Sequence, residues 1–247
     1  MVHKNEPNNL RQRKFLWPCG WMLSFWSGSI NMIASYAILF LRVSHMTGPA
    51  SDLSRFALTD FRMALFILFV IVSFVFGAYV SGVVAKRVKF STNLMLSTIP
   101  AMVLMSLILT NLTFAGRLED YIFAMLLPLG MGWQNGATSQ SEIGRTTHVT
   151  GDITDIGLKI AEGDWVKAGY FGIKFLSFVL GGMTGLFFMG FSPVIGLVIS
   201  VLGIAMMGVV INTFDHQTLA HKEGLSHNIP VLETHESVDM HKATANT

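Results

Sequence analysis

The sequence predicts an all-α polytopic membrane protein with about six transmembrane helices, arranged as two inverted three-helix repeats. Composition is the first reason, since 51% of the 247 residues are hydrophobic and only 13% are charged, against roughly 25% in soluble domains. The second is that six apolar stretches are each long enough to cross roughly 30 Å of hydrocarbon. The third is a motif that occurs once in each half of the chain. A lipid bilayer is therefore the expected surrounding of most of the surface.

Six predicted spans lie near residues 17–41, 62–85, 92–112, 118–138, 168–189 and 192–212. The second, third, fifth and sixth read as clean apolar spans, with Arg62 near the start of the second. The first and fourth differ, because Asn31 lies in one, and Gln134 and Asn135 lie in the other. Amides are costly toward lipid, so we expect these to face the protein interior or a cavity.

The basic residues favour one orientation of the spans. They gather before the first span, after the second and after the fourth, as Lys4, Arg11, Arg13, Lys14, Lys86, Arg87, Lys89, Arg145, Lys159 and Lys167. The positive-inside rule then places both termini in the cytoplasm. The first apolar stretch is too long for the core of a signal peptide, so we expect it to remain as a span.

An internal repeat relates the two halves of the chain. At an offset of 103, residues 42–52 align with residues 145–155. The identical pairs are Arg42 and Arg145, His45 and His148, Thr47 and Thr150, Gly48 and Gly151, and Asp52 and Asp155. Upstream, Asn31 and Asn135 are 104 positions apart, one more than the offset of the loops. Downstream, a run of small residues recurs at the same offset of 104. Because each repeat has three spans, the copies are expected in opposite orientations, as in many secondary transporters.

The predicted organisation is a cytoplasmic segment 1–14, repeats 15–113 and 114–212, and a disordered cytoplasmic tail 213–247. The tail contains five histidines, His216, His221, His227, His235 and His241. Spacings of five to eight residues do not place them on one helix face. We expect a solvated tail, with metal capture as the alternative.

The paired loops also carry a resemblance to a known family. Ser44-His-Met-Thr-Gly48, Trp133-Gln-Asn-Gly136 and the second loop, residues 145–154, are similar to the YoaK-like bacterial membrane proteins, a "domain of unknown function" family. The resemblance covers most of residues 17–212. It implies a multi-span protein of the bacterial inner membrane and no particular substrate or reaction.

Two interpretations of the paired motif remain open. In the first, Gly48 and Gly151 are left-handed caps, with Thr47, Thr150 and Asp152 satisfying backbone groups at the start of short interfacial helices near residues 49–59 and 153–162. In the second, the helix N-termini bind a polar or anionic solute, and the histidines couple its movement to protons. The candidate substrate-binding residues are then Asn31, Arg42, His45, Thr47, Gly48, Gln134, Asn135, Arg145, His148, Thr150, Gly151 and Asp155.

Several function classes are excluded by the sequence. A net charge of +2 is too small for a nucleic-acid surface, and the single cysteine allows neither an internal disulfide nor a cysteine metal site. The chain lacks the usual hydrolase, zinc-protease and phosphate-binding motifs, so we expect no enzyme, cofactor or metal. The sequence favours a secondary transporter or binder of a small polar or anionic solute. The alternative is a membrane scaffold that associates with itself, as a homo-oligomer, or with a partner through Gly-rich spans two and five.

Overall fold

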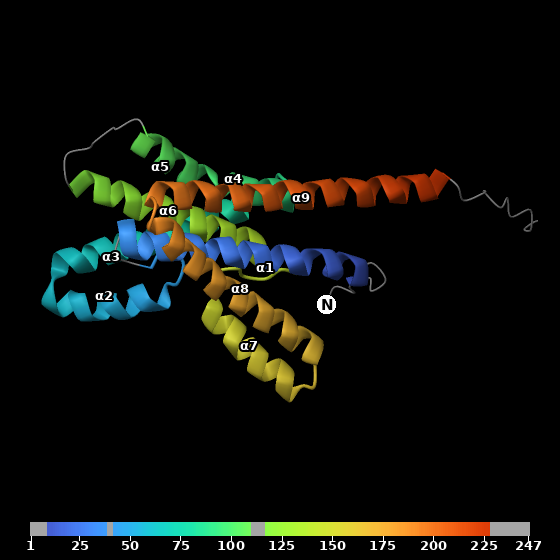
Figure 1. Cartoon of the computed structure of the whole chain (residues 1–247), viewed down its shortest axis with the longest axis horizontal. Coiled ribbons are helices and arrows are strands. Elements are labelled where there is room, and N and C mark those ends of the chain that lie inside the picture. Colours follow the sequence, from blue (N-terminus) through green and yellow to red (C-terminus); the bar gives the residue numbers. More distant parts are fainter. Residues whose placement is uncertain (1–8, 39–41, 110–116, 228–247) are drawn as a thin grey trace, which may run out of the picture. The chain divides into compact units, whose positions relative to one another are not determined.

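The computed structural model describes residues 9–38, 42–109 and 117–227, and within these ranges the chain is helical and contains no strand (Figure 1). Two compact units are present, Met1–Asn212 and Thr213–Thr247. The first half of the chain contains α1 (Asn9–Ile33), the π-helix η1 (Ala34–Ile38), α2 (Thr47–Thr59), α3 (Phe61–Val84), α4 (Phe90–Leu96) and α5 (Ile99–Leu109). The second half contains α6 (Arg117–Ser139), α7 (Val149–Ala161), α8 (Trp165–Met189) and α9 (Pro193–His227).

Four segments are long and apolar enough to cross a membrane. They are Phe61–Val84, Phe90–Ile108, Trp165–Met189 and Pro193–Phe214, and they correspond to the second, third, fifth and sixth predicted spans. The predicted all-α fold is therefore confirmed for the described residues, with four helical segments that could span a membrane. The fifth span is not free of charge, however, because Lys174 lies within α8.

The two remaining predicted spans, α1 and α6, are inner helices of the first unit. Their long apolar stretches are interrupted by polar residues that lower the hydropathy, and several of these residues are buried. Ser27 and Gln134 are 0% and 1% exposed. In contrast, α3 and α8 expose large apolar side chains, for example Val75, Tyr79 and Phe187, as expected of helices that face lipid.

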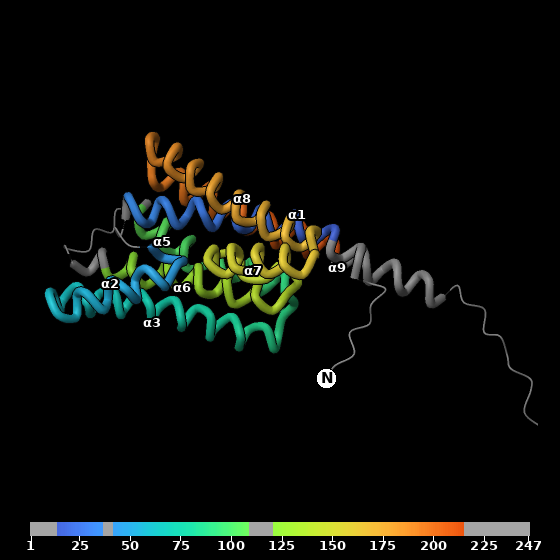
Figure 2. The backbone as a smooth tube through the Cα atoms, turned by 90° about the horizontal axis from the view of Figure 1, so that it is seen from below, coloured from blue at the N-terminus to red at the C-terminus, as the bar shows by residue number. Residues whose placement is uncertain are grey.

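Close helix crossings organise the first unit. Helix α1 packs against α8, and α3 packs against α6, as can be followed in Figure 2 for α1 and α8. At both crossings glycine allows the backbones to touch. A Cβ on Gly28 would overlap the carbonyl oxygen of Phe178, and a Cβ on Gly132 would overlap that of Phe74. The contacts are reciprocal, since a Cβ on Gly181 would overlap the Phe25 carbonyl, and one on Gly77 that of Leu129.

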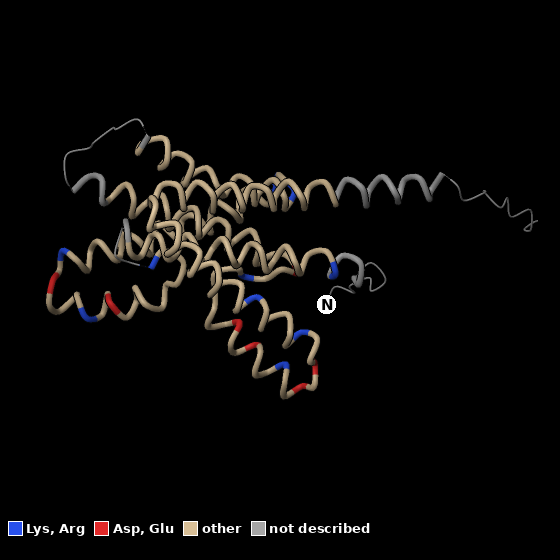
Figure 3. The backbone as a smooth tube through the Cα atoms, in the orientation of Figure 1, with Lys and Arg blue, Asp and Glu red and all other residues tan. Residues whose placement is uncertain are grey.

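The short helices α2 and α7 each form a hairpin with the long helix that follows, α2 with α3 and α7 with α8. Asp and Glu residues gather along these two hairpins, while most of the remaining described chain is uncharged (Figure 3). In the first hairpin, Asp60 caps α3, because its Oδ1 accepts hydrogen bonds from the backbone N–H groups of Arg62 and Met63 at 3.0 and 3.2 Å. In the second, Asp164 caps α8 through the Lys167 N–H at 3.0 Å.

The predicted capping role of the motif glycines is wrong. Helices α2 and α7 begin earlier than expected, so Gly48 and Gly151 lie within their first turns. Within the described residues, the glycines with left-handed backbone are Gly144 and Gly163, with φ of 70° and 75°. Neither Thr47 nor Thr150 is the N-cap either, because these caps are Met46 and His148, and neither makes a side-chain capping hydrogen bond.

Candidate functional site

The first motif loop is held in place by Asn31 of α1. The Asn31 Oδ1 accepts hydrogen bonds from the backbone N–H and the hydroxyl of Ser44, at 3.3 and 2.8 Å. The same hydroxyl lies 3.0 Å from Nδ1 of His45. Because Asn31 and Ser44 are both buried, this chain of contacts fixes the position of the imidazole. Asn31 acts here on the protein itself, as an anchor for the loop.

His45 occupies a partly buried position beside α8. Its ring packs in a T-shaped arrangement against the ring of Phe178, with the ring centroids 5.0 Å apart. Burial, followed by the positive charges of Arg42 and His148, lowers the pKa of His45 to about 4. His45 is therefore neutral at physiological pH. The effect of His148 also means that the histidines of the two motif loops lie close enough to interact electrostatically.

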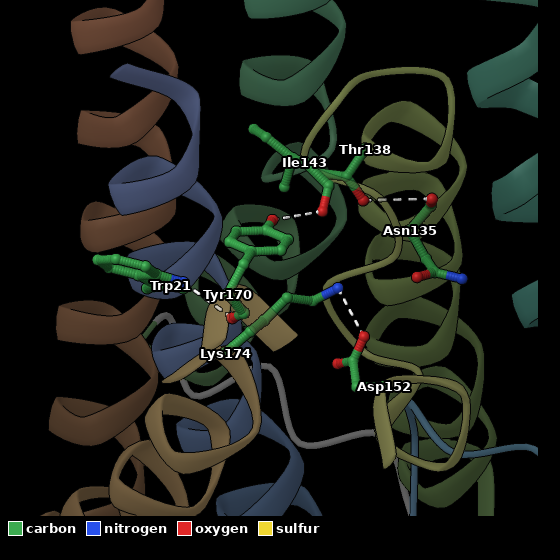
Figure 4. A network of polar contacts seen from close by, with 7 residues as sticks. All are labelled: Trp21, Asn135, Thr138, Ile143, Asp152, Tyr170 and Lys174. Atoms are coloured by element: carbon green, nitrogen blue, oxygen red, sulfur yellow. Dashed lines mark hydrogen bonds and ion pairs between the residues drawn. The ribbon is translucent and has the colours of Figure 1, made fainter. Parts of the chain in front are cut away.

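Gln134 joins α6 to α1 and to the second motif loop. Its Nε2 donates to the hydroxyl of Ser27 at 2.8 Å and to Oγ1 of Thr146 at 3.2 Å. Asn135 is less well satisfied. Its Oδ1 is buried and lacks a hydrogen-bond partner among the described residues, while its backbone carbonyl accepts from Thr138 at 3.3 Å (Figure 4).

A buried ion pair lies beside the second motif loop. Lys174 Nζ donates to Asp152 Oδ1 at 2.8 Å, and the two side chains are only 1% and 8% exposed. Asp152 lies in the first turn of α7, and Lys174 lies in α8, one of the helices long and apolar enough to cross a membrane. Sequence reasoning named neither as a site residue. A single lysine within an apolar span was the available signal, since such a charge is costly unless it is paired.

Aromatic side chains and backbone groups surround this pair (Figure 4). The Lys174 ammonium lies 5.8 Å from the ring centre of Tyr170 and 5.5 Å from that of Phe171. The Tyr170 hydroxyl donates to the carbonyl of Ile143 at 2.7 Å, and Trp21 Nε1 donates to the carbonyl of Tyr170 at 3.2 Å. The loop before α7 and helix α1 are thereby tied to α8.

The pKa of Asp152 is shifted by its surroundings in the fold. Burial raises the pKa of Asp152 above its usual value, and the nearby Asp155 charge acts in the same direction. The Lys174 charge and hydrogen bond, together with His148, oppose this effect. The net direction is upward because the loss of hydration is the largest contribution.

The other motif residues lie closer to the surface. Arg42, Thr47, Arg145, His148 and Thr150 are exposed, and Gly48, Gly151 and Asp155 are partly buried. The two glycines allow close approach within their own loops, since a Cβ on Gly48 would lie 3.2 Å from Nη1 of Arg42 and one on Gly151 would lie 2.6 Å from Cδ2 of His148. The structure thus brings Arg42, His45 and His148 into one electrostatic environment, with Asp152 and Lys174 beside His148.

A small cavity lies elsewhere between the helices. It has a volume of about 10 Å³, roughly the room that one water molecule needs. Gln134, Ser97 and Thr98 contribute its polar lining, and Ile30 and Val201 are among its apolar contacts. Neither Asn31 nor Asn135 lines it.

Among the described residues, no group of three or more His, Cys, Asp or Glu side chains could hold a metal ion. His235 and His241 lie outside the described residues, and nothing is described of the side chains of His216, His221 and His227.

Residues 19–211 match the protein family described as "Protein of unknown function (DUF1275)". The resemblance of the sequence to the YoaK-like proteins agrees with this match. No curated protein and no solved structure matches the chain.

Proposed function

We propose that this chain, which belongs to the DUF1275 family, binds a small polar or anionic solute and carries it across the bacterial inner membrane. It does so as a secondary transporter rather than as an enzyme. The observation that carries the proposal is the buried pair of Lys174 and Asp152, 2.8 Å apart beside the second motif loop. Ionisable groups inside a membrane protein are expensive, and they commonly mark solute or proton pathways.

The proposed architecture has six spans in two inverted repeats, with α1 and α6 as the first and fourth spans and both termini in the cytoplasm. The reciprocal glycine contacts support it. Gly28 and Gly132 are 104 positions apart in the sequence, and so are their partners Phe178 and Phe74. The same offset relates Gly181 to Gly77 and Phe25 to Leu129. Such equivalence is expected when two copies of one unit are related by a pseudo-two-fold axis.

The alternative function is that of a non-transporting scaffold, which self-associates or binds a partner through small residues of α3 and α8. The glycine contacts weigh against it. Gly77, Gly181 and Gly185 meet α6 or α1 of the same chain so closely that a Cβ would overlap backbone atoms. They are therefore already used within the chain, and do not form a free association surface.

Solute binding can be tested on the full chain purified in detergent. We would record its thermal unfolding midpoint with a metabolite panel of carboxylates, amino acids, sugars and phosphates, at pH 5.5 and 7.5. A ligand that binds only the folded state raises the midpoint in proportion to its concentration and affinity. We expect at least one compound to stabilise the protein, and this stabilisation to weaken in Arg42→Gln or Arg145→Gln.

The matched control is Arg55→Gln, which removes an exposed arginine from α2 outside the motif. It should leave the ligand effect unchanged. If no compound of any class stabilises the protein, and the motif variants merely unfold earlier than wild type, the solute-binding proposal is wrong and the scaffold gains support.

A further inference from the structure

The Lys174 ammonium occupies a site built for one carboxylate. An ammonium has three donors, and among the described residues its hydrogen-bond acceptor is Oδ1 of Asp152. The rings of Tyr170 and Phe171 lie within 6 Å of Nζ. The ammonium is therefore attracted to two aromatic π-faces rather than to a second anion. The identity and location of its one acceptor therefore define the chemistry that this cation can recognise.

That acceptor is carried on a different helix from the lysine. Asp152 lies in the first turn of α7, after a loop in which Gly144 has a left-handed φ of 70°. Lys174 lies well within α8, and the α7–α8 turn passes through Gly163, which is also left-handed. Because the two groups are on different helices, the Asp152 and Lys174 side chains can separate without a break in the backbone hydrogen bonds of α8.

Charge limits what can replace Asp152. A site that is only 1% exposed at the lysine holds one positive and one negative group at tolerable cost, whereas an additional unpaired carboxylate would be strongly unfavourable there. A second anion can enter only if a positive charge enters with it, and a proton on Asp152 is the simplest such charge. Burial favours the uptake of that proton, because it raises the pKa of the Asp152 carboxyl.

We propose that Lys174 binds the carboxylate of a small organic acid in place of Asp152, and that Asp152 takes up one proton from solvent as it is displaced. The site holds an ammonium and a carboxylate before the exchange. Afterwards it holds the same ammonium, the solute carboxylate and a neutral aspartic acid, so its net charge is unchanged. This inference rests on the proposed solute-binding function and assigns its substrate class.

Three other titratable groups face Asp152 besides Lys174. They are Asp155 on α7, His148 in the preceding loop and Tyr170 on α8. Of these, His148 belongs to the residue type that most often changes charge near neutral pH, so its contribution must be separated from that of Asp152. The test must therefore include His148→Gln beside the Asp152 variants.

The probes are acetate, propionate and benzoate, each compared with its uncharged amide, on the full chain in detergent between about pH 6 and pH 8. Binding is measured as the rise in unfolding midpoint with probe concentration. If one proton is taken up per carboxylate, apparent affinity rises about tenfold for each unit of pH decrease above the pKa of Asp152. The amides should give no stabilisation.

Asp152→Asn imitates the protonated acid, so it should bind the carboxylates with no dependence on pH and more tightly than wild type at pH 8.

Lys174→Met should lose binding. Because that change leaves Asp152 buried and unpaired, Lys174→Met combined with Asp152→Leu provides a second, uncharged variant that should fold and still bind no carboxylate. Lys159→Gln is the matched control, since it removes a more exposed lysine that pairs with Glu162 on the surface, and it should behave as wild type.

The proposal is overturned if carboxylates stabilise wild type and Asp152→Asn no better than amides do, or if the pH dependence persists in Asp152→Asn and disappears in His148→Gln. Carboxylate binding that survives in the double variant overturns it as well. Stabilisation by a solute of another class, without any carboxylate effect, overturns this inference and leaves the solute-binding function standing. If no compound of any class binds, both are wrong.

Discussion

At the scale of single residues, His45 makes folding depend on pH. Its pKa falls from about 6.5 to about 4 in the folded protein, so the folded state favours the neutral ring. The resulting stability is complete above about pH 6.5 and is lost as pH falls toward 4, by about 3 kcal/mol in all. We expect the unfolding midpoint of wild type to fall more steeply over this range than that of His45→Gln. Parallel pH profiles for the two proteins would contradict this assignment.

Asn31 and Asn135 occupy nearly equivalent places in the repeats but should respond differently to mutation. Asn31→Leu leaves the buried N–H and hydroxyl of Ser44 without their acceptor, at a cost of about 1–3 kcal/mol. Asn135→Leu removes a carbonyl oxygen that has no hydrogen-bond partner among the described residues, so it should cost much less. Denaturant unfolding of both variants compares them directly. Equal losses would mean that the Asn31–Ser44 contact is not what stabilises the loop.

The candidate site could be predicted from sequence only in part, and Lys174 shows why. The repeat identified His45 and His148, because identical residues at one offset stand out in a single sequence. Lys174 aligns with Val70 at the offset of 104, and Asp152 aligns with Pro49 at 103. The ion pair exists in one repeat alone, so a comparison of the two halves for identical residues does not detect it. Its partner lies 22 positions away in the sequence, and only the folded α7–α8 hairpin brings the two residues into contact.

At the scale of helices, the crossing glycines should be among the least tolerant positions in the chain. A Cβ at Gly28 or Gly132 would overlap a backbone carbonyl of the opposing helix, and backbone cannot move aside as a side chain can. Gly28→Ala and Gly132→Ala should each destabilise the protein by about 3 kcal/mol or more. The measurement is the unfolding midpoint, together with the monodisperse fraction on size-exclusion chromatography.

Gly172→Ala is the control for these variants, because a Cβ there would meet no atom within 4 Å. It also lies in a long helix, α8, where alanine is favoured over glycine by up to about 1 kcal/mol. It should therefore be neutral or stabilising. If Gly172→Ala and Gly28→Ala were equally harmful, the close crossing would not be the cause.

The short helices show the limit of local sequence signals. The predicted ranges 49–59 and 153–162 lie close to α2 at Thr47–Thr59 and α7 at Val149–Ala161. The role given to the motif glycines was wrong, because the handedness of a glycine depends on which side of the helix boundary it falls. Helix α2 begins two residues earlier than expected and α7 four residues earlier, which moves Gly48 and Gly151 from the expected cap into the first turn.

At the scale of the whole chain, the number of spans depends on two helices that hydropathy alone does not identify. Helices α1 and α6 have 25 and 23 residues, enough for the roughly 30 Å of a bilayer core. Several of their polar residues, among them Ser27 and Gln134, are buried, so these helices need not be apolar all round. A hydropathy criterion measures what faces lipid and therefore undercounts inner helices.

The two span counts make opposite predictions for α2 and α7. If α1 and α6 both cross the membrane, α2 lies outside and α7 in the cytoplasm. If only the four apolar segments cross, two crossings separate α2 from α7, and both lie on one side. The chain has one cysteine, Cys19, so Cys19→Ala gives a background in which Arg55→Cys on α2 and Lys159→Cys on α7 can each be labelled alone.

We expect a membrane-impermeant maleimide to label Arg55→Cys on intact cells, and Lys159→Cys only after the membrane is opened. Because the positive-inside rule assigns the cytoplasmic side from charge and the repeat assigns opposite sides from the number of spans, one experiment tests both. Labelling of both cysteines on the same side would mean that α6 does not cross the membrane and would remove the inverted repeat of three spans each. The transport proposal would then lose its symmetry argument and rest on Lys174 and Asp152 alone.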